Sequence, residues 1–206
     1  RYEGLYIGMP AMYHSTGPVP NYPNTVGFHL VQLVCSRDLT EWNRLGDRQT
    51  FIGPSRLDSG AYDLTQILPP SAPVIRDDEL WFYYTGLKWR GSFRYIGEYP
   101  HGKHVPIRGR DRDGGAVCLA VLRRDGFVSL DAGGRAGVLE TQAFRVTAGN
   151  LHLNADVFDG ELVVEVLDSR GRVVAESAAV HGDHTRFVVE WERGSLADLS
   201  DQIVSL

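Results

Sequence analysis

The sequence is divided into short apolar runs by turn residues, and this pattern limits the chain to a fold built of short strands. The longest apolar runs, Leu-Val-Gln-Leu-Val at residues 30–34 and Leu-Trp-Phe-Tyr-Tyr at 80–84, have the length of strands. Glycine (23) and proline (10) are spread through all 206 residues, and only residues 194–204 carry a helical turn pattern. Short runs rich in β-branched and aromatic residues between turn signals predict an all-β protein.

One structural unit occurs twice in the sequence. Residues 3–14 (EGLYIGMPAMYH) resemble residues 78–89 (DELWFYYTGLKW), because each has an acidic lead, a Leu-aromatic pair and an aromatic end. Each is followed by a long irregular stretch and then by a second apolar run, 30–38 or 117–125, that ends in Arg-Asp. Such recurrence is typical of a repeat architecture. With four antiparallel strands to a unit, it predicts consecutive blades of a β-propeller.

The two Arg-Asp turns are predicted to connect the third and fourth strands of successive blades. Aspartate tolerates turn geometry and can accept a bond from the backbone two residues later. Gly126 follows Asp125, which strengthens the hairpin signal. Trp42 is expected to pack between blades. A structural role for Asp38 and Asp125 is therefore favoured over a catalytic one.

The long loops are expected on one face of the propeller and the tight turns on the other, because alternate connections of an antiparallel blade emerge on opposite sides. These loops are residues 12–28, 51–62 and 88–115. Long loops on one rim of a rigid scaffold are where binding and chemistry usually occur. The pattern therefore selects a functional face before any residue is given a role.

The sequence pattern changes near residue 138. Apolar and polar residues alternate in segments such as 161–166 and 186–191, which predicts an antiparallel β-sandwich with one solvated face on each sheet. We therefore place propeller blades in residues 1–135 and a sandwich, expected to be incomplete, in residues 136–206.

Composition and spacing exclude several classes of function. The net charge is −5 and no basic tract stands out, so nucleic acid is not an expected partner. No apolar run approaches the ~18 residues of a membrane helix, and no membrane partner is expected. Cys35 and Cys118 lie inside apolar runs and are expected as free thiols. No Cys/His cluster has metal-site spacing, and no cofactor is expected. The chain begins at Arg1 without a signal peptide, which leaves its localisation open and does not exclude secretion or the periplasm.

With these residues in view, the chain resembles the C-terminal part of five-bladed β-propeller glycoside hydrolases of the invertase/levanase and arabinanase type. It resembles most closely the bacterial hydrolase-like proteins related to them, over nearly its whole length. The motifs that carry the resemblance are YEGLYIGMPAMYH, LVCSRDLTEWNRLGDRQTFI, LDSGAYD, DDELWFYYTG, LRRDGFVSLDAG and LHLNADVFDGELVVEVLDSRGRVV.

The resemblance implies exo-type hydrolysis of a glycosidic bond, with a carbohydrate substrate held in a propeller pocket. Such enzymes use two carboxyl groups, one kept protonated as general acid and one ionised as base or nucleophile. In the family these lie in the first blade and about midway round the ring, whereas this chain matches the last two blades. The resemblance therefore implies N-terminal blades of the same protein as partner, with at least one catalytic carboxylate outside this chain.

Asp58 is the carboxylate of this chain that we expect in the pocket, as a substrate contact or catalytic group. It lies on the long-loop face, where the small Ser59 and Gly60 beside it leave space for a ligand. The alternative is a structural role, in which Asp58 caps the loop by accepting backbone bonds. Ring side chains expected to bind the sugar by stacking and hydrogen bonds are Tyr13, His14, Tyr62, Trp89, His101 and His104. Their alternative is to pack the loops down or, for 88–115, to form a solvated insertion; no metal role is expected.

Two functions remain open from the sequence. The first is a glycoside hydrolase, and the second is a propeller or sandwich that binds glycans without cleaving them. A pair of pocket carboxylates in the upstream blades would favour the enzyme, and their absence would favour the binding module.

Overall fold

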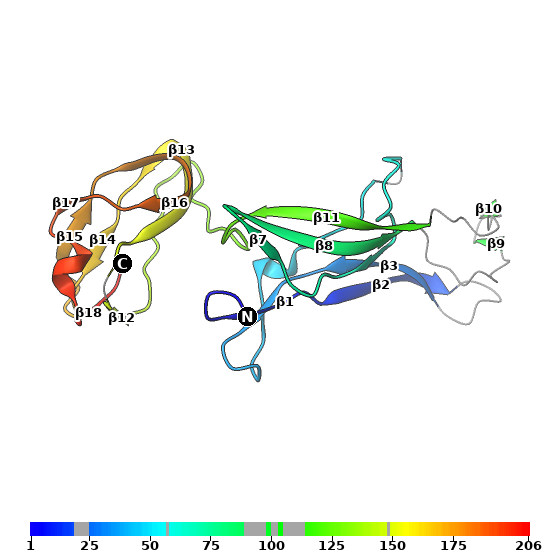
Figure 1. Cartoon of the computed structure of the whole chain (residues 1–206), viewed down its shortest axis with the longest axis horizontal. Helices are drawn as coiled ribbons and strands as arrows, with labels where there is room; N and C mark the ends of the chain where they lie inside the picture. Colours follow the sequence, from blue (N-terminus) through cyan, green and yellow to red (C-terminus); the bar gives the residue numbers. More distant parts are fainter. Residues whose placement is uncertain (19–24, 57, 89–97, 100–102, 105–113, 148) are drawn as a thin grey trace. The chain divides into compact units, whose positions relative to one another are not determined.

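A computed structural model of the chain describes residues 1–18, 25–56, 58–88, 98–99, 103–104, 114–147 and 149–206. The regular elements in these ranges are strands, apart from two short 3-10 helices, η1 (Gly46–Arg48) and η2 (Leu196–Leu199). The all-β prediction is therefore confirmed. Within the described ranges the strands form several small sheets, none of which closes on itself. The chain divides into two compact units, Arg1–Leu122 and Arg123–Leu206 (Figure 1).

A long antiparallel hairpin begins the first unit. It is formed by β1 (Tyr6–Gly8), β2 (Ala11–Pro18), β3 (Thr25–Val31) and β4 (Val34–Ser36), and β5 (Asn43–Arg44) pairs with the other side of β4. β1 pairs with β4 and β2 pairs with β3 in one continuous register, from Tyr6↔Ser36 to Ser15↔Gly27. Pro10 interrupts the first of these strands, because it has no N–H to donate to the ladder. Residues 12–28 were expected as a long loop, and this is wrong: most of them are paired strand.

A second sheet is centred on β8. Its strands are β6 (Gln66–Leu68), β7 (Val74–Arg76), β8 (Glu79–Leu87) and β11 (Gly115–Arg123). β8 lies between β11 and β6 and also pairs with β7. Two further short strands, β9 (Glu98–Tyr99) and β10 (Lys103–His104), pair only with each other among the described residues.

Each repeat begins with a tight two-residue turn. Arg76 and Glu79 are paired across Asp77 and Asp78, and Asp77 has a positive φ of 50°. In the first repeat Tyr2 and Leu5 exchange two backbone hydrogen bonds of 2.8 Å across two residues that both have positive φ. The equivalence of residues 3–14 and 78–89 in sequence is therefore accompanied by a similar local turn.

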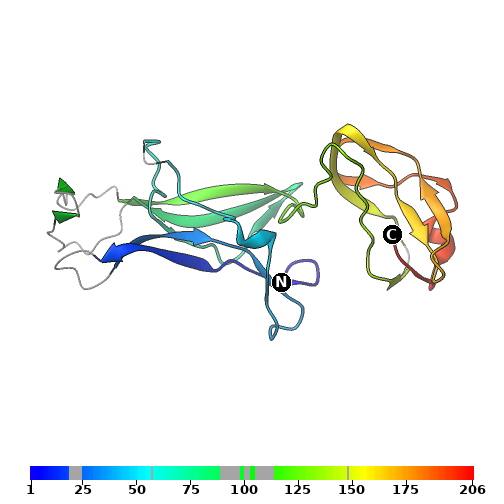
Figure 2. The same ribbon diagram turned by 180° about the vertical axis from the view of Figure 1, so that it is seen from behind.

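The hydrophobic core of the first unit lies between the hairpin and the second sheet. Figures 1 and 2 both show β2 and β3 running beside β8 and β11. Val31, Ile67 and Leu80 have no exposed surface, and Phe82 is 1% exposed. The ring of Phe51 meets that of Phe82 edge-on, with centroids 5.4 Å apart. Burial of these side chains is the main stabilising term for the unit, at about 1.5–3 kcal/mol for each large apolar side chain.

The Arg-Asp turn after β4 is a structural device, as expected. Asp38 Oδ1 accepts hydrogen bonds from the backbone N–H groups of Thr40 (2.9 Å) and Glu41 (3.0 Å). The Thr40 side chain and these N–H groups hold the pKa of Asp38 well below its usual range. Trp42 is 45% exposed and donates from Nε1 to Leu39 O at 3.1 Å. It therefore closes its own turn, and its packing between blades stays a prediction.

The corresponding turn after β11 also forms, but no strand follows it. Asp125 has a positive φ of 61°, and Gly126 N–H donates to Arg123 O at 3.1 Å. Residues 127–131 contain bends and no ladder pairing, so the fourth strand of the second repeat is not formed there.

The described residues of the second unit form three small antiparallel sheets. Its strands are β12 (Phe144–Arg145), β13 (His152–Leu162), β14 (Glu165–Leu167), β15 (Val173–Ser177), β16 (Val180–Val188), β17 (Trp191–Arg193) and β18 (Ile203–Val204). β13 pairs with β16, β15 lies between β14 and β17, and β12 pairs with β18. The core is the cluster Val146, Val166, Ala175, Leu196 and Val204.

The predicted alternation in the second unit is confirmed. Val164 and Val166 are buried, whereas Val163 and Glu165 are exposed. The helical pattern at residues 194–204 corresponds to η2, whose N-cap Ser195 accepts a hydrogen bond from Asp198 N–H.

Candidate functional site

The described residues of the first unit concentrate ring side chains on the β2–β3 hairpin. In its register Tyr13 lies opposite His29, and His14 lies opposite Phe28. The Tyr13 and His29 rings are 5.3 Å apart and tilted by 51°. The His14 and Phe28 rings are 5.4 Å apart and stacked within 9°. Tyr13 and His14 are both exposed, so each ring pair can meet a ligand from solvent.

The two ring pairs lie on opposite faces of the hairpin. Successive side chains of a strand point to opposite sides, and Tyr13 and His14 are adjacent in β2. The structure therefore does not bring these two predicted sugar-binding residues together on one surface. Each ring instead packs against a ring of the partner strand, and such a cross-strand pair stabilises a sheet by about 0.2–1 kcal/mol.

Phe28 and His29 are candidate residues that the sequence reasoning missed. Phe28 was assigned to the loop 12–28 and His29 was given no role, although the run Thr25-Val26-Gly27-Phe28-His29 is rich in strand-forming residues. His29 Nδ1 is buried and has no hydrogen-bond partner among the described residues. Such a buried polar atom usually has a partner, so His29 marks a polar point beside the Tyr13 ring.

Gly27 allows the Tyr13 ring to lie close to the β3 backbone. A Cβ at Gly27 would lie 2.1 Å from His14 O and 2.7 Å from Tyr13 Cζ. Both separations are far below contact distance, so a larger residue would displace the ring or open the hairpin. The ring arrangement therefore depends on a glycine at this position.

Asp58 lies on an exposed loop that closes on itself. Ser55 N–H donates to Asp63 O at 3.0 Å, and Ser59 N–H donates to Arg56 O at 3.0 Å. Ser59 Oγ also donates to Arg56 O at 2.6 Å. The Asp58 side chain is 74% exposed and lies 3.2 Å from the Arg56 guanidinium, a pairing of little energetic weight at such exposure. Ser59 thus holds the loop, while Asp58 presents its carboxylate to solvent.

Tyr62, at the end of this loop, is half-buried. The Lys88 ammonium lies 4.4 Å from the centroid of its ring. Such a cation–π contact contributes about 0.5–1 kcal/mol near the surface. One face of the predicted sugar-binding ring of Tyr62 is therefore occupied by a residue of the same chain.

A buried hydrogen bond between Tyr84 and Asp63 holds the end of this loop. The Tyr84 hydroxyl donates to Asp63 Oδ2 at 2.6 Å, and both residues are buried, at 8% and 6% exposure. Burial, followed by the hydrogen bond to Asp63, raises the pKa of Tyr84 well above its usual range. Burial and the nearby Asp63 also raise the pKa of the Cys118 thiol. Asp63 therefore has a structural role.

Three predicted ring residues lie at the limit of the described structure. Trp89 and His101 fall outside the described residues. His104 is described by its backbone only, which pairs with Glu98 across β9 and β10.

Comparisons of the chain with family models, with curated proteins and with solved structures found no match. Among the described residues, no group of three or more His, Cys, Asp or Glu side chains could bind a metal ion. No helix in the described parts of the chain is long and apolar enough to cross a membrane.

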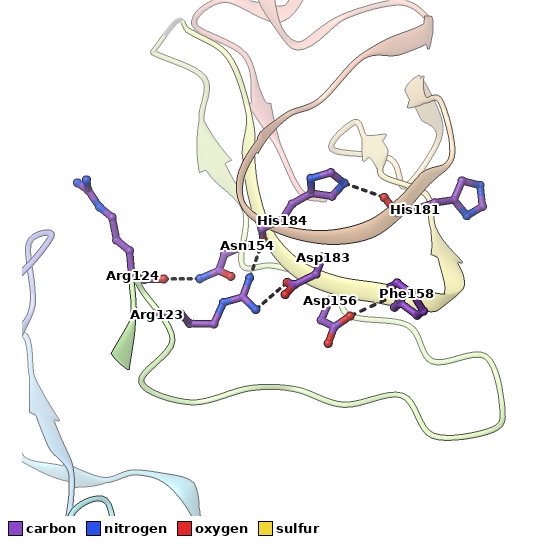
Figure 3. Close-up of polar contacts among 8 residues, drawn as sticks. All are labelled: Arg123, Arg124, Asn154, Asp156, Phe158, His181, Asp183 and His184. Atoms are coloured by element: carbon purple, nitrogen blue, oxygen red, sulfur yellow. Dashed lines mark hydrogen bonds and ion pairs between the residues drawn. The ribbon is translucent and has the colours of Figure 1, made fainter. Parts of the chain in front are cut away.

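A second polar group lies on the β13–β16 strand pair of the C-terminal unit (Figure 3). The Arg123 guanidinium donates to Asp183 Oδ1 and to His184 O, each at 2.8 Å. Asn154 Nδ2 donates to Arg124 O at 2.6 Å. These contacts fix the first residues of the unit onto its longest strand pair, and no sequence motif indicated them.

Proposed function

We propose that this chain is part of a carbohydrate-active protein of the glycoside hydrolase type, in which a β-propeller pocket hydrolyses a terminal glycosidic bond. The observation that carries the proposal is the pairing of exposed rings on the β2–β3 hairpin, Tyr13 with His29 and His14 with Phe28. An aromatic face packs against the apolar face of a sugar ring, and hydroxyl and imidazole groups can bond its hydroxyls.

Within this proposal Asp58 is the carboxylate of this chain that meets the substrate. Its 74% exposed side chain suits a hydrogen-bond acceptor for sugar hydroxyls or an ionised base. A general acid requires a desolvated carboxyl group whose pKa is raised. Asp63 is the buried carboxylate nearby, but the Tyr84 hydroxyl occupies one of its oxygens. The proposal therefore takes the general acid from other blades of the same protein.

An apolar sheet face supports the expectation of further blades. Large apolar side chains of the second sheet are exposed, namely Val74 (49%), Tyr83 (48%), Val117 (75%), Leu119 (41%) and Val121 (51%). β11 is also an edge strand of its sheet, and it carries no charge between Gly115 and Leu122. Exposed uncharged edges of this kind are normally covered in native proteins. A neighbouring blade of the same protein would cover both the face and the edge.

The alternative is a glycan-binding module without catalysis. The exposure of Asp58 fits this alternative too, because an exposed carboxylate can accept hydrogen bonds from sugar hydroxyls without transferring a proton. Ring stacking on the hairpin serves this alternative equally well.

The test is a hydrolysis screen with aryl glycosides on the full-length protein, combined with affinity electrophoresis in soluble polysaccharides. The variants are Asp58→Ala and Tyr13→Ala, with Asp78→Ala as a control that removes an exposed carboxylate from a turn. We expect Tyr13→Ala to weaken binding about tenfold and Asp78→Ala to have no effect. Loss of turnover in Asp58→Ala supports the enzyme, and binding without turnover in the wild type supports the alternative. Absence of both activities in the wild type refutes the proposal.

A further inference from the structure

Strand β13 contains a four-residue bulge where it pairs with β16. Val157 pairs with Gly182 and Leu162 pairs with Val180, so residues 158–161 lie opposite His181 alone. Asp159-Gly160 is a hairpin-turn signal in sequence, but both residues lie inside β13. Bulges bend a strand and change the direction of its side chains, and they are frequent beside functional sites.

The bulge carries the most exposed aromatic residue described in the chain. Phe158 is 81% exposed, whereas the alternate residues Leu153, Ala155 and Val157 of the same strand are half-buried. A phenylalanine at this exposure loses the stabilisation that burial would supply, at about 1.5–3 kcal/mol. Its ring therefore offers a flat apolar surface to whatever binds there.

The bulge is held in one conformation by two hydrogen bonds. His181 Nδ1 lies 2.8 Å from Gly160 O, and because a carbonyl oxygen only accepts, the imidazole donates. Asp156 Oδ1 accepts from Phe158 N–H at 3.2 Å. The Asp156 carboxylate is thus bonded to the backbone of the residue that carries the ring.

Hydrogen-bond acceptors lie next to the ring. Asp156 is directly opposite Asp183, and directly opposed side chains have Cβ atoms about 4.5–5.5 Å apart. Figure 3 shows Asp156 and Phe158 projecting from the same side of β13, with Asp183 near Asp156. Asp156 Oδ2 has no hydrogen bond within the described part of the chain.

Arg123 offsets the repulsion between these two carboxylates. Opposed like charges destabilise a strand pair, but the Arg123 guanidinium lies 2.8 Å from Asp183 Oδ1. The two carboxylates and the guanidinium together carry one negative charge. The surface next to Phe158 is therefore rich in acceptors while having little net charge.

We propose that Phe158, Asp156 and Asp183 form a surface site for a sugar ring on the C-terminal unit, separate from the hairpin site. A sugar has an apolar face for the phenylalanine ring and several hydroxyl donors for the carboxylate oxygens. Among the described residues these two carboxylates do not belong to any group of three or more His, Cys, Asp or Glu side chains that could hold a metal ion. The ligand class rests on the proposed function, whereas the site itself rests on the bulge, the ring and the opposed carboxylates.

The test is affinity electrophoresis of the full chain in gels containing inulin, levan, arabinan or xylan. The variants are Phe158→Ala and Asp156→Ala, and the matched control is Val163→Ala, which removes a side chain 46% exposed in the same unit. We expect retardation by at least one polysaccharide, weakened about tenfold by each of the two site variants and unchanged by the control. Circular dichroism of each variant establishes that it folds.

Tyr13→Ala separates this inference from the proposed function. Loss of retardation in Phe158→Ala but not in Tyr13→Ala supports the C-terminal site and counts against the hairpin site. The reverse pattern overturns the inference and leaves the proposed function standing. No retardation of the wild type in any gel also overturns it.

Discussion

Replacing Tyr84 by phenylalanine tests whether a buried hydrogen bond supports the Asp58 loop. The change removes one oxygen and leaves Asp63, which is 6% exposed, without the donor that lies 2.6 Å from its Oδ2. A hydrogen bond to a charged group stabilises a protein by about 1.5–3 kcal/mol, and an unpaired buried acceptor costs a similar amount. We therefore expect Tyr84→Phe to lower the free energy of unfolding of the first unit by about 1.5–3 kcal/mol.

The assay is equilibrium urea unfolding followed by tryptophan fluorescence. Three of the four tryptophans lie in residues 1–122, so the signal reports mainly the first unit. The matched control is Tyr83→Phe, whose hydroxyl belongs to a side chain 48% exposed, and it should change stability by less than about 0.5 kcal/mol. In an Asp63→Asn background Tyr84→Phe should have a smaller effect, because the two residues act through one contact.

The same pair predicts a pH dependence. Burial and the bond to Asp63 raise the pKa of Tyr84, whereas a tyrosine in the unfolded chain has a pKa of about 10. Above that pH the unfolded state loses its proton first, so the stability contributed by Tyr84 is complete below about pH 10 and declines as pH rises further. The stability difference between wild type and Tyr84→Phe should therefore narrow above about pH 10. Equal stability of the Tyr84→Phe and Tyr83→Phe proteins would refute the reasoning.

Three further predictions concern turns. Gly194→Ala should destabilise the second unit more than Gly171→Ala does, as measured by thermal unfolding. Both glycines have positive φ, but only at Gly194 would a Cβ lie 2.7 Å from a backbone carbonyl oxygen. Equal destabilisation by the two substitutions would disprove the close contact. The Arg172 backbone N–H and then its side chain lower the pKa of Asp168 to about 2. The contribution of Asp168 to stability is thus present above about pH 4 and lost as pH falls towards about 2. The Asp168→Asn protein should therefore lose less stability than the wild type over this pH range, as measured by acid unfolding. Asp38→Ala should speed hydrogen exchange of the amides that it caps by about tenfold or more, measured by NMR, and unchanged exchange would exclude the cap.

Part of the candidate site could be predicted from the sequence. Asp58 was identified because a carboxylate next to Ser59 and Gly60 has space around it, and it is exposed as that reasoning requires. Phe28 and His29 were missed, because the residues around them were assigned to a loop and their importance depends on pairing with Tyr13 and His14. Loop assignments rest on turn residues such as Gly27, which here serves close packing inside a strand.

The second polar group, in which Arg123 bonds Asp183, could not be predicted from sequence patterns. Arg123 is the last residue of β11, directly before the Arg-Asp turn, and nothing local indicates that it bonds Asp183, 60 positions further along the chain. Phe158 follows a period-two alternation that predicts only the face of a strand, not a bulge. The extra residues of a bulge become visible only when the partner strand is known.

The sequence by itself determined that this chain is all-β, that two segments of similar sequence each begin with a tight turn, and which residues of segments such as 161–166 face inward. These properties are local, because the pleat of a strand and the conformations open to glycine, proline and aspartate depend on near neighbours. Only the tertiary structure decided which side chains meet: Tyr13 with His29, Tyr84 with Asp63, and Asp156 with Asp183. Strand register sets these meetings, and it is settled by burial and hydrogen bonding between segments far apart in the chain.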